Sequence, residues 1–277
     1  MLGKIDDLPA IAIQTFADEI IVAFPQQPEV TAKVIEIARR LNVSVKVAIE
    51  TFGCDVREKG LEQLSDIVLL PVLEKRDPLV QACLKRSADI LLSIFALLVT
   101  APLMAVIAAI VKLDSPGLIF YHSLRAGRRG DLFTCYKFRT MACDADQRKD
   151  ELRTSNERSG PFFKLTNDPR VTRSGKFLRR YSLDELPQFW NVLRGEMSLV
   201  GPRPHPVDDF QRYELEHLRR LEAVPGMTGL WQVTARRDPS FQRNMALDLE
   251  YIEHGTLWMD VKVLFKTLSV ILQGNGV

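Results

Sequence analysis

The hydrophobic positions of residues 1–80 follow two alternating periods. Residues 19–25 form a short apolar run, residues 28–42 repeat apolar side chains every three to four positions, and residues 43–50 alternate with period two. Residues 65–74 form a further apolar run. This β-α-β pattern predicts a small α/β domain with some parallel strand pairing. The segment has neither a G-x-G-x-x-G motif nor a P-loop, which favours a structural or regulatory module over a catalytic one.

The next apolar segment differs in kind, because residues 90–111 hold no charged side chain over 22 positions. A helix of that length measures roughly 33 Å at about 1.5 Å per residue. A bilayer core is about 30 Å thick, so the segment predicts a membrane helix. The alternative is a buried helix of a soluble domain, but such helices seldom run this long without a polar face.

Two features argue against a simple crossing of the membrane. Pro102 lies near the middle of the segment, where it removes a backbone hydrogen bond and kinks a helix. Basic residues flank both ends, with Lys85 and Arg86 before and Lys112 after, and positive flanks favour the cytoplasm. A bent helix that enters and leaves one leaflet satisfies both facts. A proline-kinked spanning helix is the alternative.

The remaining pattern is polar and mixed. Residues 118–123 and 132–141 flank GRRGD and predict a β-hairpin, while the highly charged residues 143–158 predict a surface helix or an ordered loop. Further helices are predicted at about 172–194, 206–222, 239–254 and 257–272. The last of these is amphipathic, and it fits either a membrane-interface helix or a core helix.

Charge is distributed unevenly along the 277 residues, although the net charge is only +2. Residues 1–80 carry nine basic and thirteen acidic side chains, and residues 125–203 carry seventeen basic and ten acidic. A basic segment indicates an anionic partner such as phosphate, nucleic acid or a membrane surface, or else a solvated face. The four cysteines fit no zinc spacing and are expected to be reduced thiols. The start, MLGKIDDLPA, is too polar for a signal peptide and suggests a truncated form of a longer protein.

Residues 181–204, YSLDELPQFWNVLRGEMSLVGPRP, are the richest in candidate chemistry. Ser182 and Glu185 have capping-box spacing, which predicts a helix that begins at Ser182 and carries Asp184 and Glu185 in its first turn. A helix start stabilises carboxylates and binds phosphate. A single acid there would be explained by helix preference alone, whereas an adjacent pair beside a basic, Gly/Pro-bounded loop favours function.

Basic residues surround this pair in the sequence. Lys137 and Arg139 lie on a predicted strand, Arg179 precedes the pair, and Arg203 occupies the PRP turn. Such donors neutralise diphosphate oxygens before an anionic nucleophile approaches, and Mg²⁺ bound by carboxylates and phosphate would help.

Three segments resemble a known family: KFRTM (137–141), SLDELPQFWNVLRGEMSLVGPRP (182–204) and PGMTGLWQV (225–233). They are similar to the motifs of the monotopic phosphoglycosyl transferases, the bacterial sugar transferase family, in the family order, and the match covers roughly residues 82–277. The preceding part resembles the end of the nucleotide-fold-like domain of the long polyprenyl glycosylphosphotransferases of exopolysaccharide synthesis, which usually begin with several transmembrane helices.

The resemblance implies an α+β, membrane-anchored protein with three parts. Residues 1–80 would be a partial, non-catalytic α/β domain, and residues 81–114 a re-entrant membrane helix. Residues 115–277 would be a largely helical catalytic domain with a β-hairpin. The family often has Ser-Pro at the bend, and Thr100 before Ala101-Pro102 is expected to serve a similar role in backbone bonding. The implied location is the cytoplasmic face of a bacterial cytoplasmic membrane.

The resemblance also implies a two-step reaction. Asp184 would attack the sugar-linked phosphate of a UDP-sugar, release UMP and form a phosphosugar–aspartyl intermediate, which undecaprenyl phosphate would then attack. Glu185 would assist in metal binding or proton transfer, and Asp184 and Glu185 would hold Mg²⁺. The expected substrate or phosphate contacts are Lys137, Arg139, Arg179, Arg203, Asp248 and Asp260.

Other functions are kept as alternatives. A membrane scaffold or regulator of polysaccharide assembly would bind partners without turnover, and an ordinary glycosyltransferase would release UDP. No nucleic-acid-binding motif accompanies the basic segment, so nucleic acid is not expected as a partner. The sugar and the oligomeric state, a homo-oligomer included, stay open.

Overall fold

The computed structural model describes residues 2–23, 28–50, 62–64, 67–73, 79–145, 147–148, 165, 168–236, 238 and 240–274. The chain divides into two compact units, residues 1–79 and residues 80–277.

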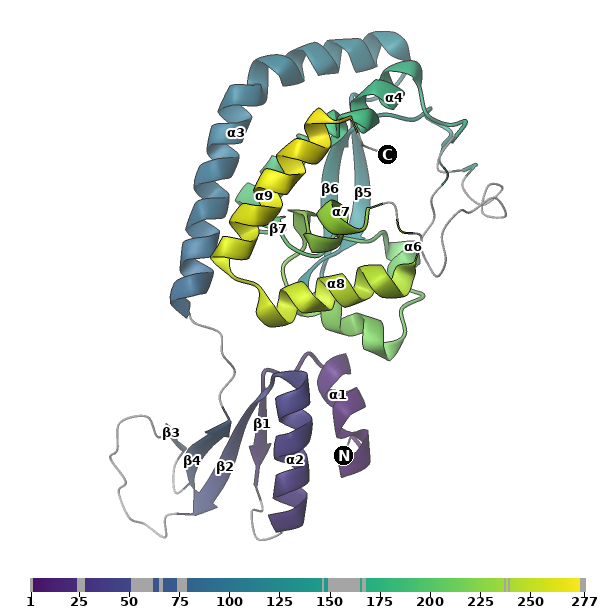
Figure 1. The fold of residues 1–277 in the computed structure, drawn as a ribbon. Coiled ribbons are helices and arrows are strands. Elements are labelled where there is room, and N and C mark those ends of the chain that lie inside the picture. Colours follow the sequence, from purple (N-terminus) through teal and green to yellow (C-terminus); the bar gives the residue numbers. More distant parts are fainter. Residues whose placement is uncertain are drawn as a thin grey trace. The chain divides into compact units, whose positions relative to one another are not determined.

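The first unit is a small α/β structure (Figure 1). Its elements are η1 Ile5–Asp7, α1 Leu8–Gln14, β1 Glu19–Val22, α2 Pro28–Leu41, β2 Ser44–Glu50, β3 Glu62–Leu64 and β4 Ile67–Leu73. The strand order is β1-β2-β4-β3, with β1 and β2 parallel and the other pairs antiparallel. The predicted β-α-β pattern is confirmed, because α2 connects the parallel strands β1 and β2. Its core is made of small branched and alanine side chains: Val22, Val34, Ala38, Val43, Val45 and Val47.

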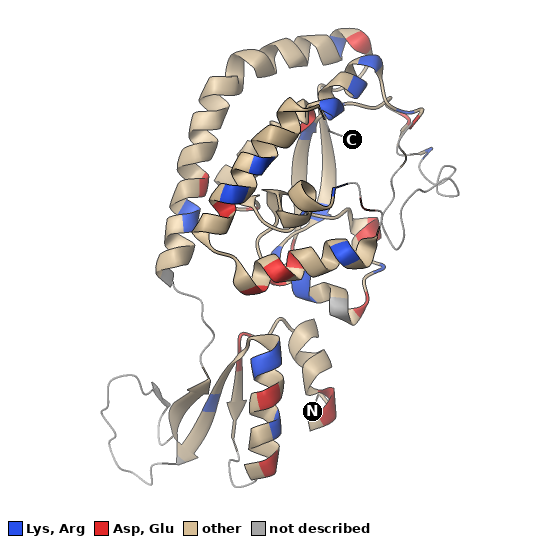
Figure 2. Ribbon diagram, in the orientation of Figure 1, with Lys and Arg blue, Asp and Glu red and all other residues tan. Residues whose placement is uncertain are grey.

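The second unit begins with α3, Leu79–Asp114, a single bent helix of 36 residues (Figure 1). Pro102 lies inside this helix, and the Thr100 hydroxyl donates to the Ala96 carbonyl at 2.7 Å. A proline that lacks an N–H and a hydroxyl that bonds one turn back both bend helices, so we attribute the bend to this pair. Val80–Asp114 is long and apolar enough to cross a membrane, and 11% of its most apolar window is buried. Figure 2 shows that charged residues occur near its two ends.

Both arms of α3 are attached to the same folded unit. On the first arm, Lys85 bonds to Asp260 at 2.7 Å, and the buried Asp89 accepts from the Leu199 amide at 3.1 Å. On the second arm, Ile107 and Val111 pack in a buried cluster with Phe138 and Leu178. The helix therefore leaves the domain and returns to it.

The rest of the unit combines an antiparallel hairpin with short helices. Strands β5, Phe120–Ala126, and β6, Leu132–Phe138, form the hairpin that was predicted from the two runs flanking GRRGD. The other elements are η2 Arg128–Gly130, α4 Arg173–Arg180, η4 Leu183–Glu185, α5 Gln188–Arg194, β7 Ser198–Val200, α6 Val207–Phe210, η5 Leu215–Glu222, β8 Gly226–Thr228, α7 Leu230–Thr234, α8 Phe241–His254 and α9 Leu257–Leu272. The main core joins β6, α5, β7, α8 and α9: Phe133, Cys135, Val192, Met197, Leu199, Val200, Tyr251 and Val263.

Two stretches that were predicted as single helices are each divided into shorter elements. The stretch 172–194 is divided into α4, η4 and α5, because Ser182 has a left-handed backbone (φ 53°) and Pro187 stands at the start of α5. The stretch 206–222 holds the four-residue α6 and the 3-10 helix η5. The helices predicted at 239–254 and 257–272 are confirmed by α8 and α9. Most of the charged stretch 143–158 lies outside the described residues.

Candidate active site

The acidic pair lies on η4, a single 3-10 turn between α4 and α5. The predicted start of a helical turn at Ser182 is confirmed, but the capping box is wrong. Ser182 makes no side-chain cap hydrogen bond, and the carboxylate of Glu185 bonds to two cations instead of the Ser182 backbone. Charge-assisted hydrogen bonds to a buried carboxylate are stronger than a neutral cap bond, which explains the exchange.

Glu185 joins two distant parts of the chain. Lys137 Nζ from β6 and Arg203 Nη2 from the turn after β7 both lie 2.6 Å from Glu185 Oε1. These two positive charges hold the pKa of Glu185 well below its ordinary value despite its burial. The Glu185 charge in turn raises the pKa of Arg203. Glu185 is therefore an anion at every physiological pH, and it fixes the positions of both cations.

Asp184 is the other half of the pair, and its surroundings differ. Its side chain is 7% exposed, and it makes no hydrogen bond or ion pair with any described residue. Burial raises the pKa of Asp184, and the Glu185 charge raises it further, while Lys137, Arg179 and Arg203 oppose the rise. A carboxylate that has three cations nearby, and no hydrogen-bond partner in the part of the chain that the structure describes, is available to an incoming group.

Arg179 is the third predicted cation that the structure brings to this pair. Its Nε donates to the Thr140 hydroxyl at 2.9 Å, and burial is the main reason that the pKa of Arg179 is lowered. Helix α4 approaches Thr140 closely at Gly175, where a Cβ atom would lie 2.1 Å from the Thr140 carbonyl oxygen. Only glycine fits there, so the contact positions α4 and Arg179 against the end of β6.

Arg125 is a basic residue at the site that the sequence analysis missed. It lies on β5 and donates to the Pro204 carbonyl at 3.0 Å, and its charge acts on both Arg203 and Glu185. Burial is the main cause of its lowered pKa. The alternating pattern of β5 could have placed Arg125 on a face with Ser123, but no spacing in the sequence indicated its contact with the PRP turn.

The PRP turn that carries Arg203 is held by a buried charge network. Arg220 Nη2 donates to the Arg203 carbonyl at 3.0 Å and to Asp248 at 2.5 Å, and both side chains are 3% exposed or less. The Arg220 guanidinium also contacts the Tyr213 hydroxyl at 2.7 Å and the ring of His205. Burial raises the pKa of Tyr213 to about 12, so its hydroxyl stays protonated.

Three of the predicted substrate contacts have other partners in the structure. Arg139 directs its guanidinium to the carbonyls of Val111 and Ser115 at the end of α3, at 3.3 and 2.7 Å. Asp248 pairs with Arg220, as described above. Asp260 accepts from Lys85 at 2.7 Å and from the Tyr251 hydroxyl at 2.6 Å, and thereby links α9 to α3. The sequence shows only that a residue is an arginine or an aspartate. It does not show whether that side chain contacts a substrate or instead bonds to another part of the protein, so the motifs alone could not distinguish the two cases.

The donor set available to a metal ion consists of the two adjacent carboxylates. Among the described residues, no group of three or more histidine, cysteine or acidic side chains is placed so that it could hold a metal ion. The carboxylate oxygens of Asp184 have no hydrogen-bond partner among the described residues. Glu185 Oε1 accepts hydrogen bonds from both Lys137 and Arg203. Two carboxylates plus phosphate oxygens and water suit Mg²⁺, which rarely has an all-protein cage. The residues therefore fit a metal that arrives with a phosphate-bearing substrate.

The second unit is similar to a known protein family. Residues 80–274, which include α3, the acidic pair and all three cations, match the family described as bacterial sugar transferase.

The chain belongs to the bacterial sugar transferase family.

Two related proteins align with more than three quarters of the chain. Galactosyl transferase CpsE of Streptococcus agalactiae serotype III is 38% identical over 245 residues, which cover 88% of this chain and 54% of CpsE. The UDP-glucose:undecaprenyl-phosphate glucose-1-phosphate transferase of Escherichia coli K12 is 36% identical over 233 residues, covering 81% of this chain and 48% of that protein. This sugar transferase therefore spans about half the length of these two relatives.

The match to a third relative covers most of that protein's own length. The exopolysaccharide production protein ExoY of Rhizobium meliloti is 42% identical over 196 residues, which cover 69% of this chain and 87% of ExoY.

Proposed function

We propose that this bacterial sugar transferase transfers a hexose-1-phosphate from a UDP-sugar to undecaprenyl phosphate and releases UMP, as the first step in assembling an exopolysaccharide, capsule or similar glycan. The names of the relatives support the substrates. The observation that carries the chemistry is the contrast within the acidic pair. Glu185 holds two cations, whereas Asp184, beside it, has no partner among the described residues.

In the proposed first step, a carboxylate oxygen of Asp184 attacks the phosphorus that carries the sugar. A bond forms between this oxygen and phosphorus, and the bond from phosphorus to the bridging oxygen breaks, so UMP leaves with the electron pair. Lys137, Arg179 and Arg203 offset the charge of the diphosphate, without which two anions would repel each other. Their fixed positions reduce the reorganisation needed in the transition state.

In the second step, a phosphate oxygen of the polyprenyl carrier attacks the same phosphorus. The bond from phosphorus to Asp184 breaks, the carboxylate is regenerated, and the product is a polyprenyl diphosphate-sugar. Covalent catalysis thus divides the reaction into two steps, the attack of Asp184 on the UDP-sugar and the attack of the polyprenyl phosphate on the intermediate. Glu185 keeps its negative charge in both steps because its pKa is low, which argues for an electrostatic role and against proton transfer. Mg²⁺ held by Asp184 or Glu185 would neutralise diphosphate charge when bound.

We also propose that α3 is a re-entrant membrane helix on the cytoplasmic face of a bacterial membrane. Both arms bond or pack against one domain, and the helix bends between them. Exposed apolar side chains cover the bend region on both sides of Pro102, including Phe95, Leu98, Val99 and Val106. Because both arms of α3 attach to the same domain, both ends of the helix would lie on the same side of the membrane.

Helix α9 extends the apolar surface beside α3. Its exposed apolar residues recur at spacings of three and four, on one face: Trp258, Val261, Phe265, Leu268 and Leu272. Lys262 lies over the Trp258 ring, 5.6 Å from its centroid. An apolar stripe with lysines beside it is typical of helices that lie in the membrane interface. Together the two helices would hold the acidic pair at the depth of lipid phosphate groups.

The test is a turnover assay with purified protein, undecaprenyl phosphate, Mg²⁺ and a panel of UDP-sugars. We expect UMP release with at least one sugar, and no release by Asp184→Asn. Asp131→Asn is the matched control, because Asp131 is exposed in the hairpin turn. Release of UDP would indicate an ordinary glycosyltransferase. Tight partner binding without any turnover would indicate a scaffold.

A further inference from the structure

Residues 137–140 connect the acidic pair to the second arm of α3. At the first position, Lys137 Nζ lies 2.6 Å from Glu185 Oε1. At the second position, Phe138 is 1% exposed and lies in one buried cluster with Val111 of α3. A cation of the proposed site is therefore followed directly along the chain by residues that pack on the membrane helix.

The third position, Arg139, attaches this segment to the end of α3. Its guanidinium donates to the carbonyls of Val111 at 3.3 Å and Ser115 at 2.7 Å, and also to the Pro116 carbonyl. The last carbonyls of a helix have no partner within the helix and carry partial negative charge, so a buried cation there caps the helix. The fit is close, because Gly117 has φ 121° and a Cβ atom there would overlap the guanidinium.

A second arginine, Arg86, makes the same kind of bond from the first arm of α3. Its guanidinium donates to the carbonyls of Val192 at 2.6 Å and Leu193 at 2.8 Å, which are among the last carbonyls of α5. Helix α5 follows the turn of the acidic pair in the chain. Each arm of α3 is thus bonded, through one arginine at a helix end, to a segment adjoining the proposed site.

We propose that Arg139 and Arg86 are positioning residues that transmit the placement of α3 in the membrane to the acidic pair, and so set the depth at which the lipid phosphate is attacked from. This inference rests on the proposed function. Both guanidinium groups bond to main-chain carbonyls, which argues against direct contact with substrate. Removing either bond would allow the acidic pair to shift relative to α3.

The two half-reactions depend differently on this depth. The UDP-sugar reaches Asp184 from water, so the first half-reaction tolerates a change in height above the membrane. The polyprenyl phosphate is held at one depth by its hydrocarbon chain. The second half-reaction, in which a carrier oxygen bonds to phosphorus and the bond to Asp184 breaks, therefore requires the correct height.

The experiment measures the half-reactions separately in the full chain, reconstituted in vesicles of phosphatidylethanolamine and phosphatidylglycerol. Formation of the Asp184 adduct from a UDP-sugar reports the first, and its discharge by undecaprenyl phosphate in the same vesicles reports the second. In Arg139→Met and Arg86→Met we expect adduct formation close to wild type and discharge slower by about 100-fold, because a displacement of roughly 1 Å can cost that much. A short-chain, water-soluble isoprenyl phosphate is not held at a fixed depth, so it should discharge both variants almost as fast as wild type.

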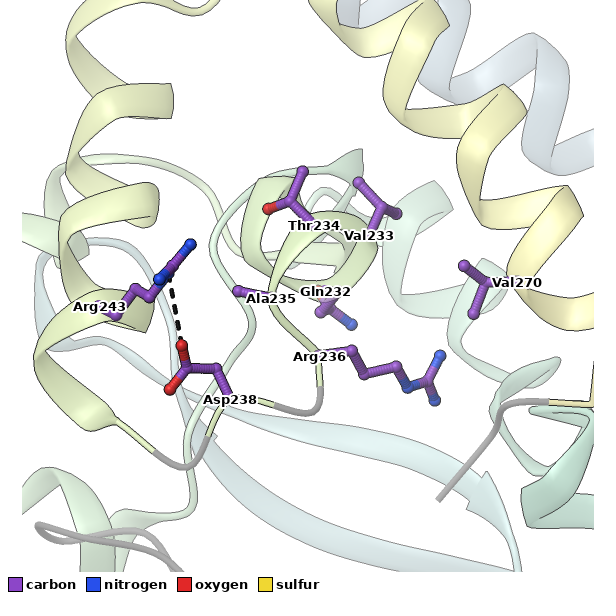
Figure 3. Close-up of a pocket in the computed structure, with 8 residues that line it drawn as sticks. All are labelled: Gln232, Val233, Thr234, Ala235, Arg236, Asp238, Arg243 and Val270. Atoms are coloured by element: carbon purple, nitrogen blue, oxygen red, sulfur yellow. Dashed lines mark ion pairs between the residues drawn. The ribbon is translucent and has the colours of Figure 1, made fainter.

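Two other arginines supply matched controls. Arg173 is exposed on α4 next to Ser174, which bonds to Asp114 at the end of α3, so Arg173→Met removes a nearby charge but no helix cap. Figure 3 shows Arg243 paired with Asp238, at 3.4 Å, beside a pocket lined by residues of α7, α8 and α9. Arg243→Met therefore removes an arginine that has a partner of its own. Both controls should discharge the adduct at the wild-type rate.

Hydrogen–deuterium exchange adds a measurement that needs no turnover. Arg139→Met should speed exchange at the end of α3 and also at the Glu185 and Leu186 amides, by about 10-fold, the effect of roughly one charge-assisted hydrogen bond. Faster exchange confined to α3, equal slowing of both half-reactions, or equal slowing with the short-chain acceptor would overturn the proposal. If wild type forms no adduct, the proposed function fails, and exchange at Glu185 and Leu186 alone decides whether Arg139 couples α3 to the acidic pair.

Discussion

The guanidinium of Arg203 lies 2.6 Å from the carboxylate of Glu185, although the two residues are 18 positions apart in the chain. This ion pair fixes the PRP turn against the turn of the acidic pair, so the site is assembled by folding and does not depend on one motif alone. Lys137 shares the same carboxylate oxygen from a third segment. Glu185 therefore organises the cations, which leaves its neighbour Asp184 available for chemistry.

Replacing Arg203 with methionine should lower kcat/KM for the UDP-sugar by about 100-fold, the typical cost of removing one preorganised donor. The reason is that the charge on the diphosphate is no longer offset, and Glu185 loses one of its two partners. Initial rates of UMP release measure the effect. Arg212→Met, at an exposed position, is the matched control and should be close to wild type. Equal rates in both variants would remove Arg203 from the reaction.

The pH dependence of turnover should report Asp184. Only the ionised carboxylate can attack phosphorus, and burial raises the pKa of Asp184 above its ordinary value. Activity should therefore be lost, as pH falls, at a higher pH than an exposed aspartate would set. In Glu185→Gln the neighbouring negative charge is gone, so the acid limb of kcat should move to lower pH even though the maximal rate falls. An acid limb that moves upward would show that loss of ordered cations outweighs loss of the Glu185 charge.

Asp248 and Arg220 should behave as positioning residues. Asp248→Asn leaves the buried Arg220 charge without the carboxylate that balances it, although its contacts with Tyr213 and His205 remain, and this should cost about 3–5 kcal/mol of unfolding free energy. The double variant Arg220→Met/Asp248→Leu removes both charges and should regain most of that stability in thermal unfolding. Its turnover should stay low, because the Arg203 carbonyl has lost its anchor. Full recovery of turnover together with stability would contradict this positioning role.

The topology of α3 can be tested with cysteines already in the chain. Cys83 lies at the start of the first arm and Cys143 lies near the end of the second, and both are exposed. With Cys54 replaced by serine, a membrane-impermeant maleimide should label both in inside-out vesicles and neither in intact spheroplasts. A spanning helix would instead expose one cysteine on each side. Cys135 is buried in the core and serves as the unlabelled reference.

Much of the fold could be predicted because its elements have local signals. The uncharged run predicted α3, the two runs flanking GRRGD predicted the β5–β6 hairpin, and helical spacing predicted α8 and α9. The boundary at Ser182 was predicted from the capping-box spacing, but the left-handed backbone of Ser182 was not, because that conformation depends on where α4 and α5 pack.

The candidate site was predictable only in part, for a related reason. Lys137, Arg179 and Arg203 meet at the acidic pair, but Arg139 has the same chemistry and binds carbonyls at the end of α3. Which arginine faces phosphate depends on tertiary contacts that no local pattern encodes.

The most direct test is the mass of the intact protein after incubation with a UDP-sugar that it accepts and Mg²⁺, with no lipid acceptor present. We predict a mass increase of one hexose phosphate, located by peptide sequencing on Asp184, that disappears when undecaprenyl phosphate is added and never forms in Asp184→Asn. UMP release without any adduct, or an adduct on a different residue, would contradict the assignment of Asp184 as the nucleophile.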